Sequence, residues 1–141
     1  SGAMLTDQGL IEGDAYNTLR YREHLQSKAQ IFADVHVKHA VPLGNPSLED
    51  SAHDTAERGL ADALIISGVG TGQPADLEDV ERVRRACPKA RLLLGSGVTA
   101  ENARSYLRFA DGVIVGSSLK RAGKLANPVD AKRVAALVEA M

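Results

Sequence analysis

The stretch Ile31-Phe32-Ala33-Asp34-Val35-His36-Val37-Lys38-His39 decides the fold. Ile31 and every second residue after it up to Val37 are apolar, whereas the other parity carries Phe32 and then polar residues as far as Lys38. Successive side chains of a strand point to opposite faces, so this pattern predicts a strand with one apolar and one polar face. Central strands of an open parallel sheet are instead buried on both faces and read apolar throughout. The stretch therefore favours a barrel wall, with helices outside and polar groups inside near its carboxyl end.

Three more apolar runs have the length and composition of buried strands, namely Ala63–Ile66, Leu92–Leu94 and Val113–Val115. Helical patterns lie between and beyond these runs, and their expected first or capping residues are Asp14, Ser47, Asp76, Thr99 and Asn127. Alternating strands and helices predict βα units around a parallel sheet. The segment Ala61–Gly68 also resembles Ala110–Ser117, which starts 49 residues later. Such repetition favours a repeating architecture, the (βα)8 barrel.

The length falls well short of a complete barrel. A (βα)8 barrel takes about 250 residues, and this chain has 141 residues with four clear strands. Four parallel strands cannot close and leave two unpaired edges. We therefore expect an α/β fold in which residues 1–141 are the C-terminal half, about strands 5 to 8, of a single (βα)8 TIM barrel domain. Its partner is then the N-terminal half of the barrel, and the alternative is a self-complementing homo-oligomer. Ser1–Met4 is either the end of strand 4 or the remnant of an expression tag.

Composition excludes several functional classes. The chain is 44% hydrophobic and 25% charged, which is ordinary for a globular protein. Lys plus Arg number 17 against 18 Asp plus Glu, so the net charge of −1 gives no basic surface for nucleic acid. No apolar run approaches the ~20 residues of a transmembrane helix. The single Cys87 excludes an internal disulfide and fits a reducing cytosol. We expect a cytoplasmic protein with at most peripheral contact at a membrane surface.

Clusters of glycine and serine follow three of the strands, at the carboxyl ends where barrel active sites lie. Glycine lets the backbone approach an anion closely, and N–H groups of a turn or a helix N-terminus bind it. Two such clusters on neighbouring strands favour a phosphate site, and the alternative is that they are tight turns and helix caps. The candidate phosphate-binding residues are Ser67, Gly68, Gly95, Ser96, Gly97, Gly116 and Ser117.

Asp34, His36 and Lys38 share one parity of the first strand, so we expect them to point into the same interior as catalytic residues. A carboxylate, an imidazole and an amine in a water-poor cavity shift one another's pKa values and suit general acid–base catalysis. The alternative is a structural layer of paired charges, although burying three ionisable groups is costly. The histidines lack the compact spacing of a metal site, so neither a metal nor another cofactor is expected.

The polar loop of residues 6–13 holds a further pair of candidates. If Ser1–Met4 ends strand 4, Asp7 and Gln8 lie at the substrate mouth beside Asp34. They are equally well explained as turn residues. Two other acidic residues, Asp62 and Asp111, directly precede strands, so we expect them to stabilise turns rather than to catalyse.

Four stretches of the chain together resemble the BtpA family: Ala3–Gly9, Ala33–Ala40, Gly95–Thr99 and Asp111–Lys120. The resemblance runs across essentially the whole chain, and DVHVKHA at residues 34–40 is its most specific part. It implies a (βα)8 barrel of the ribulose-phosphate-binding type in a longer chain, of which this sequence is the C-terminal half. It also implies that Ser1–Met4 is native.

The resemblance implies a role in photosystem I biogenesis at the thylakoid surface for cyanobacterial members, but members also occur without photosynthesis. It implies no settled reaction and no catalytic residues, and it strengthens the phosphate-site interpretation. The leading hypothesis is a barrel that binds a phosphorylated small molecule, a sugar phosphate or a nucleotide-like metabolite. As an enzyme it would be an isomerase or epimerase, an aldolase-type lyase or a phosphate-ester hydrolase. The competing hypothesis is a non-catalytic assembly factor that uses the barrel as a scaffold.

Overall fold

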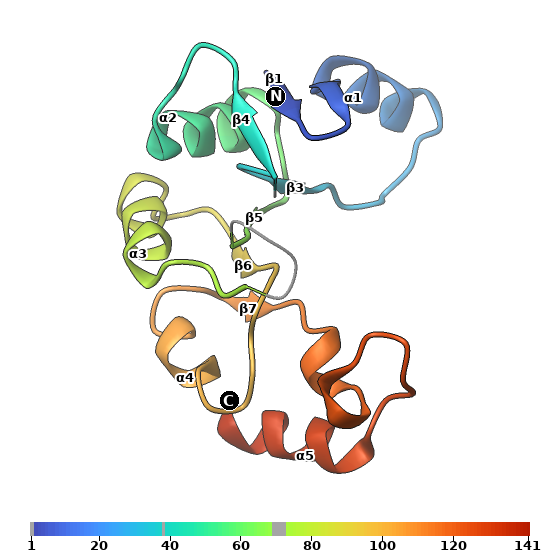
Figure 1. Cartoon of the computed structure of the whole chain (residues 1–141). Coiled ribbons are helices and arrows are strands. Elements are labelled where there is room, and N and C mark those ends of the chain that lie inside the picture. Colours follow the sequence, from blue (N-terminus) through green and yellow to red (C-terminus); the bar gives the residue numbers. More distant parts are fainter. Residues whose placement is uncertain (1, 38, 69–72) are drawn as a thin grey trace.

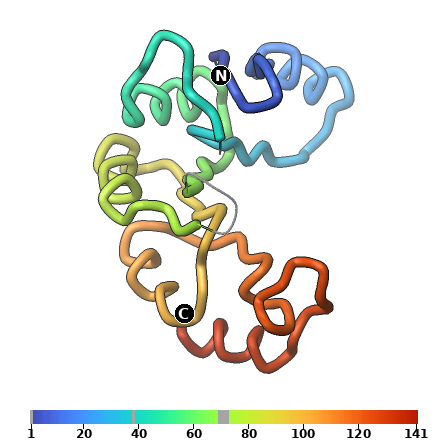
Figure 2. Tube along the Cα trace, in the orientation of Figure 1, coloured from blue at the N-terminus to red at the C-terminus, as the bar shows by residue number. Residues whose placement is uncertain are grey.

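A computed structural model describes residues 2–37, 39–68 and 73–141 of the chain. A parallel sheet lies at its centre, a small antiparallel sheet lies at one end, and helix α5 (Ala131–Ala140) lies at the other (Figure 1). The tube in Figure 2 passes through the βα units in chain order from one end of the molecule to the other. This serial arrangement confirms the prediction of a parallel α/β fold.

The central sheet consists of β3 (Phe32–Asp34), β5 (Ala63–Ile66), β6 (Leu92–Leu94) and β7 (Gly112–Val113) in the order β3-β5-β6-β7. All three pairings are parallel, and each strand lies beside the next strand of this sheet in the sequence. Such an order is that of a barrel wall, in which every βα unit adds one strand on the same side. The predicted runs for β5 and β6 agree with the observed bounds. The strands β3 and β7 are shorter than predicted.

In the part of the chain that the structure describes, helices cover one face of this sheet and not the other. The helices α2 (Leu48–His53), α3 (Leu77–Ala86) and α4 (Ala103–Tyr106) lie on one side of the strands (Figure 1). Side chains of alternate strand residues and of these helices form the core, which includes Val35, Leu64, Ile66, Val80, Val83, Leu92, Leu94 and Tyr106. On the opposite face Phe32 is 50% exposed and Ile114 is 46% exposed. A parallel sheet normally has both faces covered, so this open face corresponds to the interior of a partial barrel.

The first two strands and the fourth form a separate antiparallel sheet, in the order β2-β1-β4. It contains β1 (Ala3–Thr6), β2 (Gly9–Glu12) and β4 (Ala40–Pro42). The antiparallel pairing of residues 3–6 does not fit the alternative in which residues 1–4 end a parallel barrel strand, and residues 6–13 contain a turn and β2 rather than a polar loop. The short runs of apolar residues pair across a two-residue turn, which Gly9 closes with a φ of +119°.

Three of the five predicted helix starts are confirmed by their caps. The side chains of Asp14, Ser47 and Asp76 accept hydrogen bonds from backbone N–H groups of α1 (Ala15–His24), α2 and α3. The helix α2 continues into a π-helical turn, η1 (Asp54–Arg58). The other two helices start later than predicted. The side chain of Asn102 accepts the N–H of Thr99 in the turn before α4. Asp130 rather than Asn127 caps α5.

Asp62 and Asp111 perform the same task at the start of two βα units, those of β5 and β7. The Asp62 carboxylate accepts the N–H of Ile31 at 2.7 Å and an N–H of Arg22 at 2.9 Å. The Asp111 carboxylate accepts the N–H of Leu92 at 2.8 Å and an N–H of Arg84 at 2.6 Å. In both cases the aspartate's own N–H donates back across the same strand pair, at 2.8 Å. The structural role predicted for these two residues is confirmed.

No helix in the described part of the chain is long and apolar enough to cross a membrane. Cys87 is buried in the core, as its position beside an amphipathic helix predicts.

Candidate functional site

Asp34 ends β3 on the open face of the sheet. Ser67, which follows β5, donates its hydroxyl to Asp34 Oδ1 at 3.3 Å. The two side chains border a cavity of about 320 Å³, which Val37, Ile65, Gly95 and Ile114 also line. We call this space the carboxylate cavity. It lies at the carboxyl ends of four parallel strands, where the active site of a barrel is built.

His36 does not share this cavity, contrary to the prediction from period-two spacing. Its Nε2 atom lies 3.0 Å from the hydroxyl of Ser51 on α2, on the helix-covered side of the sheet. The alternation fails because β3 ends at Asp34 and the chain bends at Val35 and His36 before it enters β4. The N–H of Val35 makes the last hydrogen bond of the parallel ladder, to Ile65. The third predicted catalytic residue, Lys38, lies outside the described residues.

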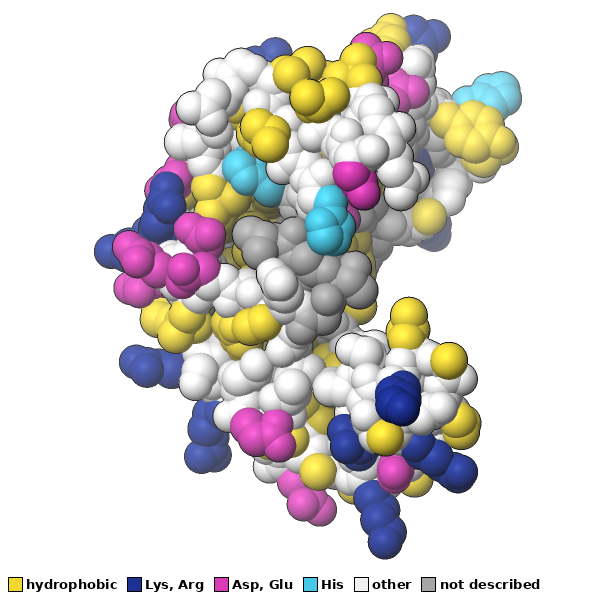
Figure 3. Space-filling model, viewed as in Figure 1, with side chains coloured by type: hydrophobic (Ala, Val, Ile, Leu, Met, Phe, Trp, Pro, Cys, Tyr) yellow, Lys and Arg dark blue, Asp and Glu magenta, His cyan; other side chains and the backbone are white. Residues whose placement is uncertain are grey.

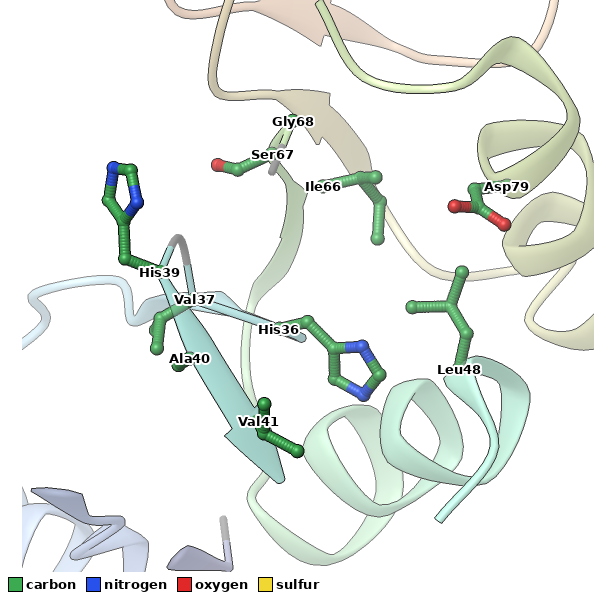
Figure 4. Close-up of a pocket in the computed structure, with 10 residues that line it drawn as sticks. All are labelled: His36, Val37, His39, Ala40, Val41, Leu48, Ile66, Ser67, Gly68 and Asp79. Atoms are coloured by element: carbon green, nitrogen blue, oxygen red, sulfur yellow. The ribbon is translucent and has the colours of Figure 1, made fainter. Parts of the chain in front are cut away.

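The ring of His36 enters a second cavity, of about 380 Å³, which we call the imidazole pocket (Figure 4). Asp79 of α3 and Leu48 of α2 line it from the helix side, and Val41 lines it from β4. Partial burial lowers the pKa of His36, although the nearby Asp79 carboxylate acts in the opposite direction. The imidazole is therefore neutral at neutral pH. His39 also borders the pocket, and it is exposed in the loop before β4.

The glycine-rich segments after β6 and β7 meet in a third cavity, of about 620 Å³, which we call the glycine cavity. The predicted phosphate-binding residues that line it are Gly95, Ser96, Gly97, Gly116 and Ser117. The structure thus brings together five of the seven candidates. Ser67 and Gly68 border the imidazole pocket instead, and Ser67 also borders the carboxylate cavity.

Gly97 and Gly116 are glycines for different reasons. Gly97 has a φ of +68°, and a Cβ atom there would lie 2.3 Å from the backbone of Pro74. It is required by the turn itself. A Cβ at Gly116 would have no atom within 4 Å, so this position opens directly onto the cavity. At Gly116, therefore, packing does not account for the absence of a side chain.

Two polar residues outside the seven phosphate-binding candidates organise the glycine cavity. Asn102 donates to the carbonyl of Gly97 at 3.0 Å and accepts the N–H of Thr99 at 2.8 Å, which fixes the first loop. Ser118 donates its hydroxyl to the carbonyl of Val98 at 2.7 Å, which ties the second loop to the first. The asparagine three residues after Thr99 is a recognisable turn signal, whereas the cross-loop bond of Ser118 has no local signature.

Positive charge gathers beside the glycine cavity. Residues 117–133 contain five basic residues and one acidic residue. Figure 3 shows Lys and Arg side chains over this C-terminal part of the molecule. Arg133 donates to the carbonyl of Ser118, which lines the cavity, at 3.0 Å. Glu101 lies on the same side, where its hydrogen bond with Thr99 is the main reason that its pKa is lowered.

The carboxylate cavity and the glycine cavity are neighbours, because Gly95 and Ile114 line both. A Cβ at Gly95 would lie 2.7 Å from the hydroxyl of Ser67 and 2.6 Å from Ile65. Glycine at this position therefore leaves room for the Ser67 side chain that bonds Asp34. Together the two cavities offer a carboxylate beside a loop-built, serine- and glycine-lined space.

Asp7 and Gln8 form the turn between β1 and β2, and both are exposed. The N–H of Gln8 bonds the hydroxyl of Thr6 at 3.1 Å, as expected of turn residues. Neither residue borders the carboxylate cavity or the glycine cavity. Within residues 2–37, 39–68 and 73–141, no group of three His, Cys, Asp or Glu side chains is placed to hold a metal ion.

Sequence comparison finds one family and relatives from distant organisms. The family model described as "BtpA family" matches residues 1–141. The chain is 50% identical over 141 residues to the photosystem I biogenesis protein BtpA of Synechocystis, covering 100% of this chain and 49% of that protein. It is 44% identical to an uncharacterized protein of Thermococcus kodakarensis, covering 99% and 52%. It is 35% identical to an uncharacterized mitochondrial protein of Caenorhabditis elegans, covering 92% and 47%. The chain thus spans about half the length of these relatives.

Two solved enzymes share the fold. N-(5'-phosphoribosyl)anthranilate isomerase from Pyrococcus furiosus superposes with a TM-score of 0.56 and 18% identity, over 89% of this chain and 56% of that one. The YdjI aldolase from Escherichia coli K12 superposes with a TM-score of 0.50 and 21% identity, over 74% and 38%. Both are TIM barrels, so the four-stranded parallel sheet is confirmed as a partial barrel.

Proposed function

The chain belongs to the BtpA family, and from this premise we propose that it forms the C-terminal half of a (βα)8 barrel that binds a phosphorylated small metabolite. The glycine cavity holds the phosphate, and Asp34 transfers a proton to or from the part of the metabolite beside it. The observation that carries the proposal is the shared wall of the two cavities, formed by Gly95 and Ile114. Phosphate sites built by the last two βα loops are frequent in barrels, and carboxylates at strand ends are frequent bases.

The chemistry of the glycine cavity suits an anion. Its described lining carries the hydroxyls of serine and threonine residues and the backbone of four loop glycines, but no carboxylate side chain. Backbone N–H groups and hydroxyls are the donors that phosphate oxygens accept, and the basic residues of the following segment add a favourable potential. Isomerases, epimerases and aldolase-type lyases all need a proton moved near the carbon skeleton. Asp34, held by the Ser67 hydroxyl, is in position to do that.

The open face of the sheet belongs to the same proposal. Phe32, Asp34 and Ile114 face the side without helices, and the relatives have about as much sequence again as this chain. We propose that the N-terminal half of the barrel covers this face. The completed interior would exclude water from Asp34, which strengthens its interactions with a substrate.

The test is a pair of substitutions at Gly116 in the full-length protein. Both Gly116→Asp and Gly116→Asn place a side chain of similar size in open space, but only the aspartate carries a charge that repels phosphate. We expect affinity for ribose 5-phosphate to fall at least about tenfold further in the aspartate variant, a difference of about 1.4 kcal/mol. Equal losses in the two variants would contradict an anion site. Asp34→Asn should leave this affinity within about threefold.

A non-catalytic assembly role is a second candidate, because one relative is named for photosystem I biogenesis. Leu5 pairs in register with Leu10 and with Val41, and the three side chains form an apolar row across the antiparallel sheet. Each is more than half exposed, which is typical of a surface that meets another protein. The two roles can be distinguished in a Synechocystis strain in which this chain replaces the matching half of the BtpA protein. An assembly role requires Leu5 and tolerates Asp34→Asn, whereas an enzyme requires Asp34 and tolerates Leu5→Lys.

A further inference from the structure

The imidazole pocket is not used by the proposed phosphate site, although it adjoins it. Val37 and Ser67 line both the imidazole pocket and the carboxylate cavity, and Gly95 then links the carboxylate cavity to the glycine cavity. The three spaces therefore follow one another along the carboxyl ends of the strands. A ligand with its phosphate in the glycine cavity and its reacting carbons beside Asp34 would extend into the imidazole pocket.

The lining of this pocket is partly apolar and partly polar. Val41, Leu48 and Ile66 supply aliphatic walls, and His36 and Asp79 supply hydrogen-bonding groups. Figure 4 shows the His36 ring pointing from the segment after β3 toward α2, with Asp79 facing the same space from α3. Because Ser51 engages Nε2 of His36, the ring is held in place and Nδ1 is the nitrogen left for a ligand. Aliphatic walls with a few placed polar groups are typical of sites for small organic molecules.

The charges of the pocket favour a neutral ligand group. Asp79 is already paired with Arg82 at 3.1 Å, so a cation is not needed to neutralise it. His36 is uncharged at neutral pH because burial lowers its pKa. Among the described residues that line the pocket there is no Lys or Arg, and the polar side chains are those of His36, His39, Ser67 and Asp79. What fits is a flat apolar ring that offers a hydrogen-bond donor to Asp79 and a second polar atom to His36.

We infer that the imidazole pocket binds a nucleobase with an exocyclic amino group, so that the metabolite of the proposed site is a nucleoside phosphate rather than a simple sugar phosphate. The amino group donates to the Asp79 carboxylate, which is how aspartate recognises the amino group of cytosine. An adjacent ring nitrogen bonds Nδ1 of His36. The ring packs between the side chains of Val41 and Leu48. A nucleoside 5'-phosphate matches the order of the cavities, since its base and phosphate lie at opposite ends of the sugar.

This inference rests on the proposed function, and calorimetric titration of the full-length protein tests the two separately. The probes are 5'-AMP and 5'-CMP, their analogues 5'-IMP and 5'-UMP that lack the amino group, and ribose 5-phosphate. We expect 5'-AMP to bind about tenfold more tightly than 5'-IMP, or 5'-CMP about tenfold more tightly than 5'-UMP. The preferred nucleotide should also bind about tenfold more tightly than ribose 5-phosphate. One hydrogen bond to a charged group provides an affinity gain of this size. Asp79→Asn should reduce the preference over the analogue to less than about threefold.

A matched pair of histidine variants provides the control. His36→Ala should weaken binding of the preferred nucleotide about tenfold and leave ribose 5-phosphate unchanged. His53→Ala, at an exposed histidine of α2 outside the pocket, should change neither. Nucleotides that bind no better than ribose 5-phosphate, or a preference that survives both His36→Ala and Asp79→Asn, would overturn the inference and leave the phosphate site standing. If ribose 5-phosphate does not bind while cytidine or adenosine binds and loses affinity in His36→Ala, the pocket stands and the phosphate site is wrong.

Discussion

Gly97 and Gly116 look equivalent in the sequence, but their surroundings predict different effects of substitution. We expect Gly97→Ala to lower the free energy of unfolding by about 1–3 kcal/mol, because it combines a left-handed φ with a clash against Pro74. Gly116→Ala should change it by less than about 1 kcal/mol, since its new methyl group meets no neighbour. Urea unfolding of both variants measures the difference. Similar losses at the two positions would show that the loop around Gly97 can rearrange.

His36 gives the molecule a pH dependence with a definite sign. Burial lowers the pKa of His36 in the folded protein below its ordinary value of 6.5, so the unfolded chain takes up a proton first as the pH falls. The contribution of His36 to stability is therefore complete above pH 6.5 and is lost as the pH falls from there to the lowered pKa. His36→Gln, which retains a partner for Ser51, should remove this part of the pH dependence. Thermal unfolding between pH 5 and pH 8 checks it, with His53→Gln as the variant that should retain the wild-type slope.

The contrast between Asp34 and His36 shows how far residue spacing predicts a site. Asp34 lies within the regular ladder, and its orientation toward the interior follows from the alternation of a strand. His36 lies only two residues later, but the chain has left the ladder to pair β4 with β1, which lie far apart in the sequence. No local pattern encodes that departure. The glycine loops were predictable because each lies at the carboxyl end of an apolar run, whereas the bond of Ser118 to the other loop depends on packing between units.

At the scale of the elements, the repeated aspartates make the clearest prediction. We expect Asp62→Ala and Asp111→Ala each to lower the free energy of unfolding, by about 1–3 kcal/mol at Asp111, because each removes the carboxylate that accepts a backbone N–H at the start of an adjacent strand and an N–H of an arginine. The two effects should have the same sign, since both carboxylates hold the same place in their βα units, those of β5 and β7. Denaturant unfolding midpoints provide the measurement. Asp54→Ala is the control, because its ion pair with Arg58 is exposed and 3.9 Å long and should contribute less than about 0.5 kcal/mol.

The same aspartates also predict that the folded protein loses stability as the pH falls. The hydrogen bond from the Ile31 amide is the main reason that the pKa of Asp62 is lowered. At Asp111, burial alone would raise the pKa, but the Leu92 amide and Arg84 together outweigh it and leave the pKa lowered. Both carboxylates therefore stabilise the fold above their ordinary pKa, and this stabilisation is lost as the pH falls through the lowered values.

Element boundaries were predictable where sequence and packing agree. The strands β5 and β6 are buried runs of Ile and Leu, and the cap at Asp76 begins an amphipathic helix. The start of α5 was predicted three residues early, because Asn127 and Pro128 form a typical cap signal. Asn127 instead donates its side-chain amide to the carbonyl of Arg121, which closes a loop, and Asp130 caps the helix. Two cap signals competed, and the loop contact decided between them.

At the scale of the molecule, the arrangement of layers explains where function can lie. Helices cover one face of the sheet, and the other face, which corresponds to the inner wall of a barrel, is open. The candidate carboxylate and the glycine loops border that open face at one end, so in the proposed complete barrel a ligand bound there would also contact the N-terminal half. A phosphate site confined to two loops can exist in the half-barrel, whereas a water-excluding reaction site needs both halves.

Phe32 and Phe109 distinguish a covered interior from an open one. Phe109 packs against the core in this chain, whereas Phe32 projects from the open face with half of its side chain exposed. If the rest of the barrel covers this face in the full-length protein, Phe32→Ala should cost about 3–5 kcal/mol of unfolding free energy, as truncation of a buried phenylalanine does, and Phe109→Ala, at a partly buried position, should also lower it. If the face is open, Phe32→Ala should cost less than about 1 kcal/mol, because an exposed side chain loses little packing. Equilibrium urea unfolding of both variants separates these results, and a large loss only at Phe109 would reject the proposed barrel completion.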